Sequence, residues 1–180
     1  MRGNRNNVIL VDAGDVETGT ADKLDAHRRG LRHRAISVFV RNRAGALLLQ
    51  RRHPAKYHSG GLWANACCSH PAPGESVAEA ASRRLREEMG IACPLAPLFT
   101  FSYRETVSSD MVENEIVHVF GGWYDGPVTP DLAEVMDTRW IGFDPLVADV
   151  AESPQAYAVW FRHYLAAHGG VIAGWSALRR

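Results

Sequence analysis

Two adjacent cysteines and a histidine stand close together in the segment NACCSHPAPGE, residues 65–75. Thiol and imidazole groups can ligate a metal ion, act as a nucleophile or base, or pack in a protein core. Three cysteines in the chain, two of them adjacent, give no disulfide framework, which favours a reducing compartment. The segment alone leaves open whether Cys67, Cys68 and His70 form a site or a buried turn.

Other potential ligands lie far from this segment. Glu113 and Glu115, in MVENEIV, are two residues apart, so on a strand they share one face. Two like charges on one face are unfavourable unless water or a cation lies between them. His27 and His33 are six residues apart in a segment that we expect to be a loop. Each of these residues alone is an ordinary surface group, but together with His70 they form a set suited to zinc, manganese or iron.

A helix over 76–89 is predicted between these groups. Ser76 and Glu79 form a capping-box pattern, apolar residues follow at four-residue spacing, and Gly90 ends the pattern. The arginines and glutamates of RRLREEMG, at i and i+4, are equally explained as exposed ion pairs.

The remaining pattern predicts one α+β domain with a mostly non-parallel sheet. Segments 35–40 and 46–52 flank RNRAG and are expected to form a hairpin. The other expected elements are strands 8–12, 98–103, 115–124 and 138–143 and a closing helix, 153–168, with Pro154 in its first turn.

Charge and hydropathy exclude several function classes. Twenty basic and twenty acidic residues cancel, so no global field attracts nucleic acid or an acidic membrane. The first residues lack the apolar run of a signal peptide, and no stretch approaches the length of a membrane span. We therefore expect a cytoplasmic monomer that acts on a small molecule.

The region from residue 69 to 91 resembles the Nudix box, G-x5-E-x7-R-E-U-x-E-E-x-G-U, in which U is a bulky aliphatic residue. Ser69 and Arg84 depart from the box, at its first glycine and at the first glutamate of its helix. Exchanging a carboxylate for a guanidinium removes metal capacity and adds a phosphate clamp. The matching positions are Glu75, Arg83, Leu85, Glu87, Glu88, Gly90 and Ile91.

A wider set of motifs resembles the type 1 isopentenyl diphosphate isomerases, which are Nudix-fold enzymes. It comprises ETGTADK (17–23), WANACCSHP (63–71), GES (74–76), RRLREEMG (83–90) and ENE (113–115), with His27, His33, Tyr103 and Trp160 in order. The resemblance runs from about Val8 to His168. It implies a Nudix-like α/β/α sandwich with a mixed, largely antiparallel sheet, in one domain over 1–180 with its core at about 8–168.

The resemblance also implies residue roles. Catalytic roles fall to Cys68, Glu115 and Tyr103, where Glu115 is the acid on the opposite face of the substrate from the Cys68 thiolate. One divalent ion, Mn²⁺ or Zn²⁺, is expected at His27, His33, His70, Glu113 and Glu115. Glu88 is expected to hold Mg²⁺ against the substrate diphosphate, which Lys23, Arg52, Lys56 and Arg84 bind, and Trp160 lines the hydrocarbon pocket.

The implied reaction converts isopentenyl diphosphate into dimethylallyl diphosphate through a tertiary carbocation. A closed, dry pocket protects the cation, and an indole face stabilises it by about 2 kcal/mol. A thiolate suits deprotonation near neutral pH, and a cation near His70 would lower the thiol pKa.

Two features depart from the expected pattern, and two other functions compete with it. The spacing of His27 and His33 is one residue shorter than expected, and Gln155 stands where an aromatic residue is expected at the pocket mouth. The competing functions are a Nudix hydrolase of a nucleoside diphosphate derivative and a metal-stabilised binding domain without catalysis. Arg84 and the cysteine disfavour the first, and the phosphate-facing cations disfavour the second.

Overall fold

Two parallel strands, β3 (His33–Arg41) and β8 (Met111–Trp123), form the centre of the sheet in the computed structural model, which describes residues 6–175. They pair from His33 opposite Glu115 to Arg41 opposite Trp123. Every other pairing between the strands of this sheet in the described residues is antiparallel. The expected mixed, largely antiparallel sheet is therefore confirmed.

Shorter strands extend the sheet on both sides of this pair. β1 joins β3 on one side, β6 pairs with the middle of β3, and β7 pairs along most of β8. β4 joins β3 at a single residue pair and takes β5 and β9 as its main partners. The other strands are β1 (Asn7–Val11), β2 (Glu17–Asp22), β4 (Leu47–Arg52), β5 (Trp63–Asn65), β6 (Cys67–Ser69), β7 (Leu95–Ser108) and β9 (Val135–Ile141).

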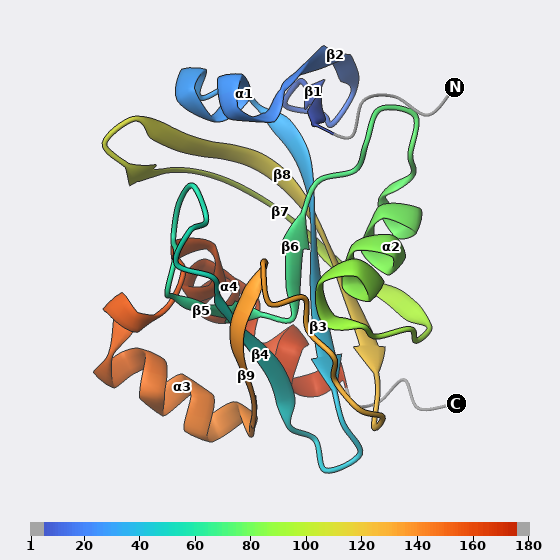
Figure 1. Cartoon of the computed structure of the whole chain (residues 1–180), viewed down its shortest axis with the longest axis vertical. Helices are drawn as coiled ribbons and strands as arrows, with labels where there is room; N and C mark the ends of the chain where they lie inside the picture. Colours follow the sequence, from blue (N-terminus) through green and yellow to red (C-terminus); the bar gives the residue numbers. More distant parts are fainter. Residues whose placement is uncertain (1–5, 176–180) are drawn as a thin grey trace.

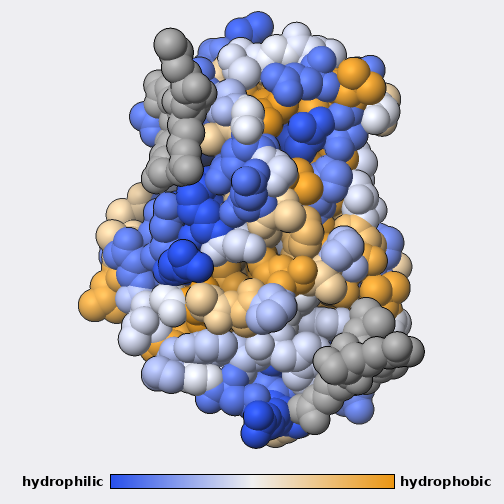
Figure 2. Space-filling model, turned by 90° about the vertical axis from the view of Figure 1, so that its right-hand side faces the viewer, coloured by the Kyte–Doolittle hydropathy of each residue, from blue (hydrophilic) through white to orange (hydrophobic). Residues whose placement is uncertain are grey.

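Helices cover both faces of the sheet (Figure 1). On one face α2 (Val77–Met89) packs over a core that contains Val38 and Cys67. On the other face α3 (Phe143–Glu152) and α4 (Val159–Gly174) enclose a second core, which contains Phe39 and Val119. This is the expected α/β/α sandwich. Figure 2 views the α2 side of the molecule, where hydrophilic side chains cover much of the surface with hydrophobic ones between them.

The predicted start and end of α2 are confirmed. The Ser76 hydroxyl accepts a hydrogen bond from the Glu79 amide, and the Glu79 carboxylate accepts one from the Ser76 amide, which completes the capping box. Gly90 ends the helix at φ 67°, a left-handed conformation that glycine adopts without strain.

Several expected elements differ in the structure. The segment around His27, expected to be a loop, contains α1 (Lys23–Arg29), which Asp22 caps and Gly30 ends. The closing helix begins at Val159 instead of 153, because Pro154–Ala156 forms a separate 3₁₀ turn. Strand 98–103 is part of the much longer β7, and β2 and α3 were not predicted. No helix within residues 6–175 is long and apolar enough to cross a membrane.

Candidate active site

Two buried imidazoles are oriented by backbone carbonyls. His27 Nδ1 lies 2.6 Å from the Lys23 carbonyl oxygen, one turn earlier in α1, and His33 Nδ1 lies 2.8 Å from that of Leu31. A carbonyl only accepts, so each Nδ1 carries the proton and each Nε2 offers a lone pair. Both Nε2 atoms are buried and have no hydrogen-bond partner. Such orphaned lone pairs are what a metal ion requires.

The other expected ligands converge on the same place. The ring centroids of His27 and His33 are 4.7 Å apart, and that of His70 is 5.0 Å from that of His33. His70 Nε2 lies 2.9 Å from Glu115 Oε1, and His33 Nε2 lies 3.3 Å from the same oxygen. The ligand atoms of His27, His33, His70 and Glu115 all lie within 4.8 Å of one another. Four of the five predicted ligands thus form one cluster, and the shorter His27–His33 spacing does not prevent it.

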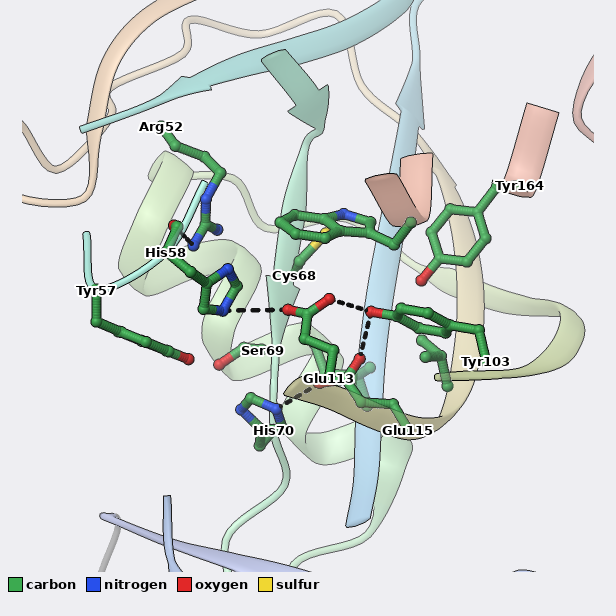
Figure 3. Close-up of a pocket in the computed structure, with 13 residues that line it drawn as sticks. Arg52, Tyr57, His58, Cys68, Ser69, His70, Tyr103, Glu113, Glu115 and Tyr164 are labelled. Carbon is green, nitrogen blue, oxygen red and sulfur yellow. Dashed lines mark hydrogen bonds and ion pairs between the residues drawn. The ribbon is translucent and has the colours of Figure 1, made fainter. Parts of the chain in front are cut away.

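Glu113, the fifth predicted ligand, belongs to a second cluster with His27 and His58. Its side chain faces the same side of β8 as Glu115, as the two-residue spacing predicted. Tyr103, opposite Glu115 on β7, donates its single hydroxyl proton between Glu113 Oε2 at 2.6 Å and Glu115 Oε2 at 2.9 Å. Figure 3 shows the two carboxylates on either side of this hydroxyl.

The two carboxylates differ in proton affinity. Burial and the charge of Glu115 raise the pKa of Glu113 well above its usual range. Burial acts on Glu115 too, but the nearby imidazoles of His33 and His70 outweigh it and hold the pKa of Glu115 low. Burial also raises the pKa of Tyr103, so its hydroxyl stays protonated. Of the two carboxylates, Glu113 therefore holds a proton more readily than Glu115, the residue expected to be the acid.

Cys67 and Cys68 point to opposite faces of the sheet, as the alternation along a strand predicts. Cys67 is fully buried in the core under α2, whereas Cys68 lines the cavity that also holds His70 and Glu115. The Cys68 thiol donates to the Asn65 amide oxygen at 3.1 Å and contacts the Ser37 hydroxyl at 3.4 Å.

The protonation state of Cys68 depends on the charges near its thiol. Burial raises the pKa of its thiol to about 12, so the protein residues alone keep it neutral near pH 7. Burial likewise lowers the pKa of His70 to about 3 and that of His58 to about 2, so these imidazoles are neutral and able to ligate a metal. A thiolate at Cys68 requires a positive charge beyond those of the side chains.

Trp160 closes the cavity from α4. Its side chain is buried, its indole nitrogen has no hydrogen-bond partner, and the Arg52 guanidinium lies over the ring, 5.1 Å from its centroid. One face of the indole thus already contacts a cation. The cavity has a volume of about 30 Å³, enough for a water molecule. Gln155 is exposed and does not line this cavity.

The four expected diphosphate ligands gather around Glu88. The pKa of Lys56 falls to about 8 because of burial, and the charges of Arg52, Arg84 and Lys23 contribute, although Glu134 forms an ion pair with its ammonium. Burial and the charge of Arg84 also lower the pKa of Lys23. Such mutual repulsion among buried cations is relieved when an anion binds.

Glu88 is nearly fully buried and forms an ion pair with Arg84. Its Oε1 accepts from Arg84 at 2.6 Å and its Oε2 from Gln50 at 3.4 Å. Within residues 6–175 it belongs to neither cluster of potential metal ligands. A single carboxylate fits Mg²⁺ only when substrate phosphates complete the coordination, since Mg²⁺ sites of this kind use one or two carboxylates with phosphate oxygens.

The rest of the Nudix-like box has a structural role. Arg83 binds both oxygens of Glu75, at 2.7 and 2.8 Å, which ties the loop before α2 to the helix. Arg84, at the position that departs from the box, bridges Glu87 and Glu88.

Two residues near the clusters were not predicted. His58 Nε2 lies 3.1 Å from Glu113 Oε1, and the Tyr57 ring lies 5.0 Å from the Lys23 ammonium. Tyr57 lines both the cavity and the adjacent hollow with Lys23 and Lys56, so it separates the imidazole cluster from the cationic one. Both belong to the loop between β4 and β5, whose sequence carries no ligand spacing that could have identified them.

Comparisons with known proteins identify the family of this chain. The NUDIX domain family matches residues 31–163. The isopentenyl-diphosphate Delta-isomerase of Burkholderia multivorans is 50% identical over 154 residues, which cover 86% of this chain and 88% of that protein. Isopentenyl-diphosphate Delta-isomerase 1 of Aromatoleum aromaticum is 52% identical over 153 residues, with 85% and 86% covered.

Solved structures show the same fold at low sequence identity. DR0079 from Deinococcus radiodurans superimposes with a TM-score of 0.68 at 22% identity, over 81% of this chain and 89% of that one. The MutT protein from Methanosarcina mazei gives 0.64 at 19% identity, over 82% and 96%. The fold and the two relatives together place this chain among the isopentenyl-diphosphate Delta-isomerases of the NUDIX family.

Proposed function

We propose that this isomerase interconverts isopentenyl diphosphate and dimethylallyl diphosphate by adding a proton on one face of the substrate and removing one on the other. The observation that carries the proposal is the position of Cys68 in the same enclosed cavity as Glu115 and Tyr103. A hydrolase needs no thiol there, whereas a proton transfer on two faces needs a donor and an acceptor.

The reaction needs one proton donor and one proton acceptor, and we assign these roles to Glu115 and Cys68. Protonation of the terminal CH₂ carbon leaves a tertiary carbocation, and loss of a proton from the carbon nearer the diphosphate restores the double bond. The hydroxyl of Tyr103 links Glu113 and Glu115, so a proton held by this pair can reach Glu115, the proposed acid. Cys68 accepts the departing proton, and its thiolate must form before that step.

The charged residues bind and orient the diphosphate. Four basic residues would supply positive charge beside the cavity: Arg52, which lines it, Lys23 and Lys56, which line the adjacent hollow, and Arg84. Glu88 would hold Mg²⁺ together with the phosphate oxygens. The buried Trp160 excludes water from the cation and offers its indole to it.

The imidazole cluster would hold the second ion, Mn²⁺ or Zn²⁺, since four neutral or anionic donors with free lone pairs suit either metal. When bound, this ion would supply the positive charge that lowers the pKa of nearby groups. Coordination of this ion would also fix the orientation of Glu115, the proposed acid. The other residues that would hold the ion are His27, His33, His70 and Glu113.

Product analysis tests the proposal. Purified protein with isopentenyl diphosphate and Mg²⁺ is expected to form dimethylallyl diphosphate without releasing inorganic phosphate or pyrophosphate. The assay is run at neutral pH, because the allylic product ionises in acid. Stoichiometric release of phosphate or pyrophosphate would overturn the isomerase and support hydrolysis.

A further inference from the structure

His58 contacts Glu113 in the same way that the predicted ligand His70 contacts Glu115. The distance between His58 Nε2 and Glu113 Oε1 is 3.1 Å, and that between His70 Nε2 and Glu115 Oε1 is 2.9 Å. Ligand atoms at about 2.1 Å from an octahedral ion are roughly 3 Å from their neighbours on that ion. By distance, His58 and Glu113 are therefore spaced like two donors to a single ion.

The two clusters of potential ligands share His27. Its Nδ1 is occupied by the Lys23 carbonyl, so only Nε2 can bind, and it can bind one ion at a time. The clusters therefore cannot both be filled through His27. The Tyr103 hydroxyl contacts both Glu113 and Glu115, which places the carboxylates of the two clusters next to each other.

We infer that His58 is a further ligand of the divalent ion, beside the five residues predicted from the sequence. Four imidazoles and two carboxylates fill an octahedron with protein donors alone. A closed site of this kind leaves no position for a water or a substrate oxygen, so the ion would fix and polarise the carboxylates and would not activate water.

Coordination by His58 also joins two parts of the proposed site. His58 is buried, and its loop carries Lys56 and Tyr57, which face the cationic hollow. An ion bound to His58 would fix this loop against β8. The competing role is that His58 donates to Glu113 and orients it without touching the ion.

The inference extends the metal site of the proposed function and is tested without substrate. Wild-type protein, His58→Gln and His53→Gln are loaded with one equivalent of Zn²⁺, and X-ray absorption at the zinc edge counts the imidazole ligands. His53 is the matched control, because it begins the same loop, accepts from the Ala55 amide and belongs to neither cluster.

Four imidazoles are expected in wild type and His53→Gln, and three in His58→Gln. Chelator competition is expected to show a zinc dissociation constant at least about tenfold higher for His58→Gln alone, which is the scale of a lost ligand or of its support. Three imidazoles in wild type, or an unchanged number in His58→Gln, would overturn the inference. The number of imidazole ligands in wild-type protein tests the inference even if His58→Gln loses its zinc. Isomerase activity is not measured in this experiment, so the proposed function is tested separately.

Discussion

Cys67 and Cys68 point to opposite faces of the sheet, and the charged residues near each of them are paired differently. On the Cys68 side of the sheet, the imidazoles of His27 and His33, whose Nε2 atoms have no hydrogen-bond partner, lie beside buried carboxylates. On the Cys67 side, the buried carboxylate Glu88 is already bound to the Arg84 guanidinium, with two lysines nearby.

This difference predicts two kinds of metal binding. The imidazole side offers several donor atoms to a cation, so an ion there would remain bound in the resting protein. At Glu88 an ion must compete with Arg84, so it would enter only with substrate phosphates that draw the arginine away. In the proposed function, the first region would carry out the proton transfers and the second would bind the diphosphate.

The largest expected effect on activity comes from replacing Cys68 or Cys67 by alanine, one at a time. Cys68→Ala is expected to remove nearly all isomerisation while fold and metal content survive, because only this sulfur lines the cavity. Cys67→Ala, the matched control, leaves turnover within about tenfold, or about 1.4 kcal/mol of barrier, and lowers the free energy of unfolding by about 1 kcal/mol. The measurements are kcat with isopentenyl diphosphate and chemical denaturation. An inactive Cys67→Ala protein beside an active Cys68→Ala protein would reverse the assignment of the two faces.

The next largest effect is expected on the metal content of the protein, which distinguishes the imidazole cluster from Glu88. His33→Ala is expected to lose most of the ion that wild type retains through gel filtration, because it removes a buried Nε2 donor. Glu88→Gln keeps this ion but no longer saturates with Mg²⁺ in the presence of substrate. Elemental analysis and Mg²⁺ titrations of the initial rate measure both. Equal loss of the resting ion in the two variants would mean that the regions form one site.

A smaller effect is expected of pH on KM for the diphosphate, through the charge of Lys56. The pKa of Lys56 in the folded protein is about 8, below its value of 10.5 in the unfolded chain. As pH rises through 8, the free enzyme loses this charge, and KM for the diphosphate rises by up to about tenfold. The unfolded chain binds more protons between these two pKa values, so the same group makes the stability rise with pH there.

Lys56→Arg provides the control, because a guanidinium keeps its charge across this range. Its KM is expected to stay flat between pH 7.5 and 9.5, a window set around that pKa of about 8. A wild-type KM that does not change in this window would show that Lys56 does not contact the diphosphate.

The features that were predictable from the sequence rest on local rules. Alternation along β6 accounts for the opposite faces of Cys67 and Cys68, and the capping box predicted α2. The spacing of Glu113 and Glu115 predicted a shared face.

The features that were missed depend on tertiary contacts. α1 has seven residues and little apolar periodicity, and only its Asp22 cap and Gly30 end define it. His58 lies in an irregular loop, so no spacing connects it to Glu113, 55 positions away. The raised pKa values of the Cys68 thiol and of Glu113 follow from burial, which the sequence does not quantify.

The central claim is that solvent-derived protons are added and removed on two faces of the substrate. Its most direct test is the reaction of isopentenyl diphosphate with the wild-type protein and Mg²⁺ in deuterated water, followed by mass and NMR analysis of the product. The account predicts dimethylallyl diphosphate that carries deuterium in its new methyl group. Product without deuterium, or substrate consumed without any allylic diphosphate, would contradict it.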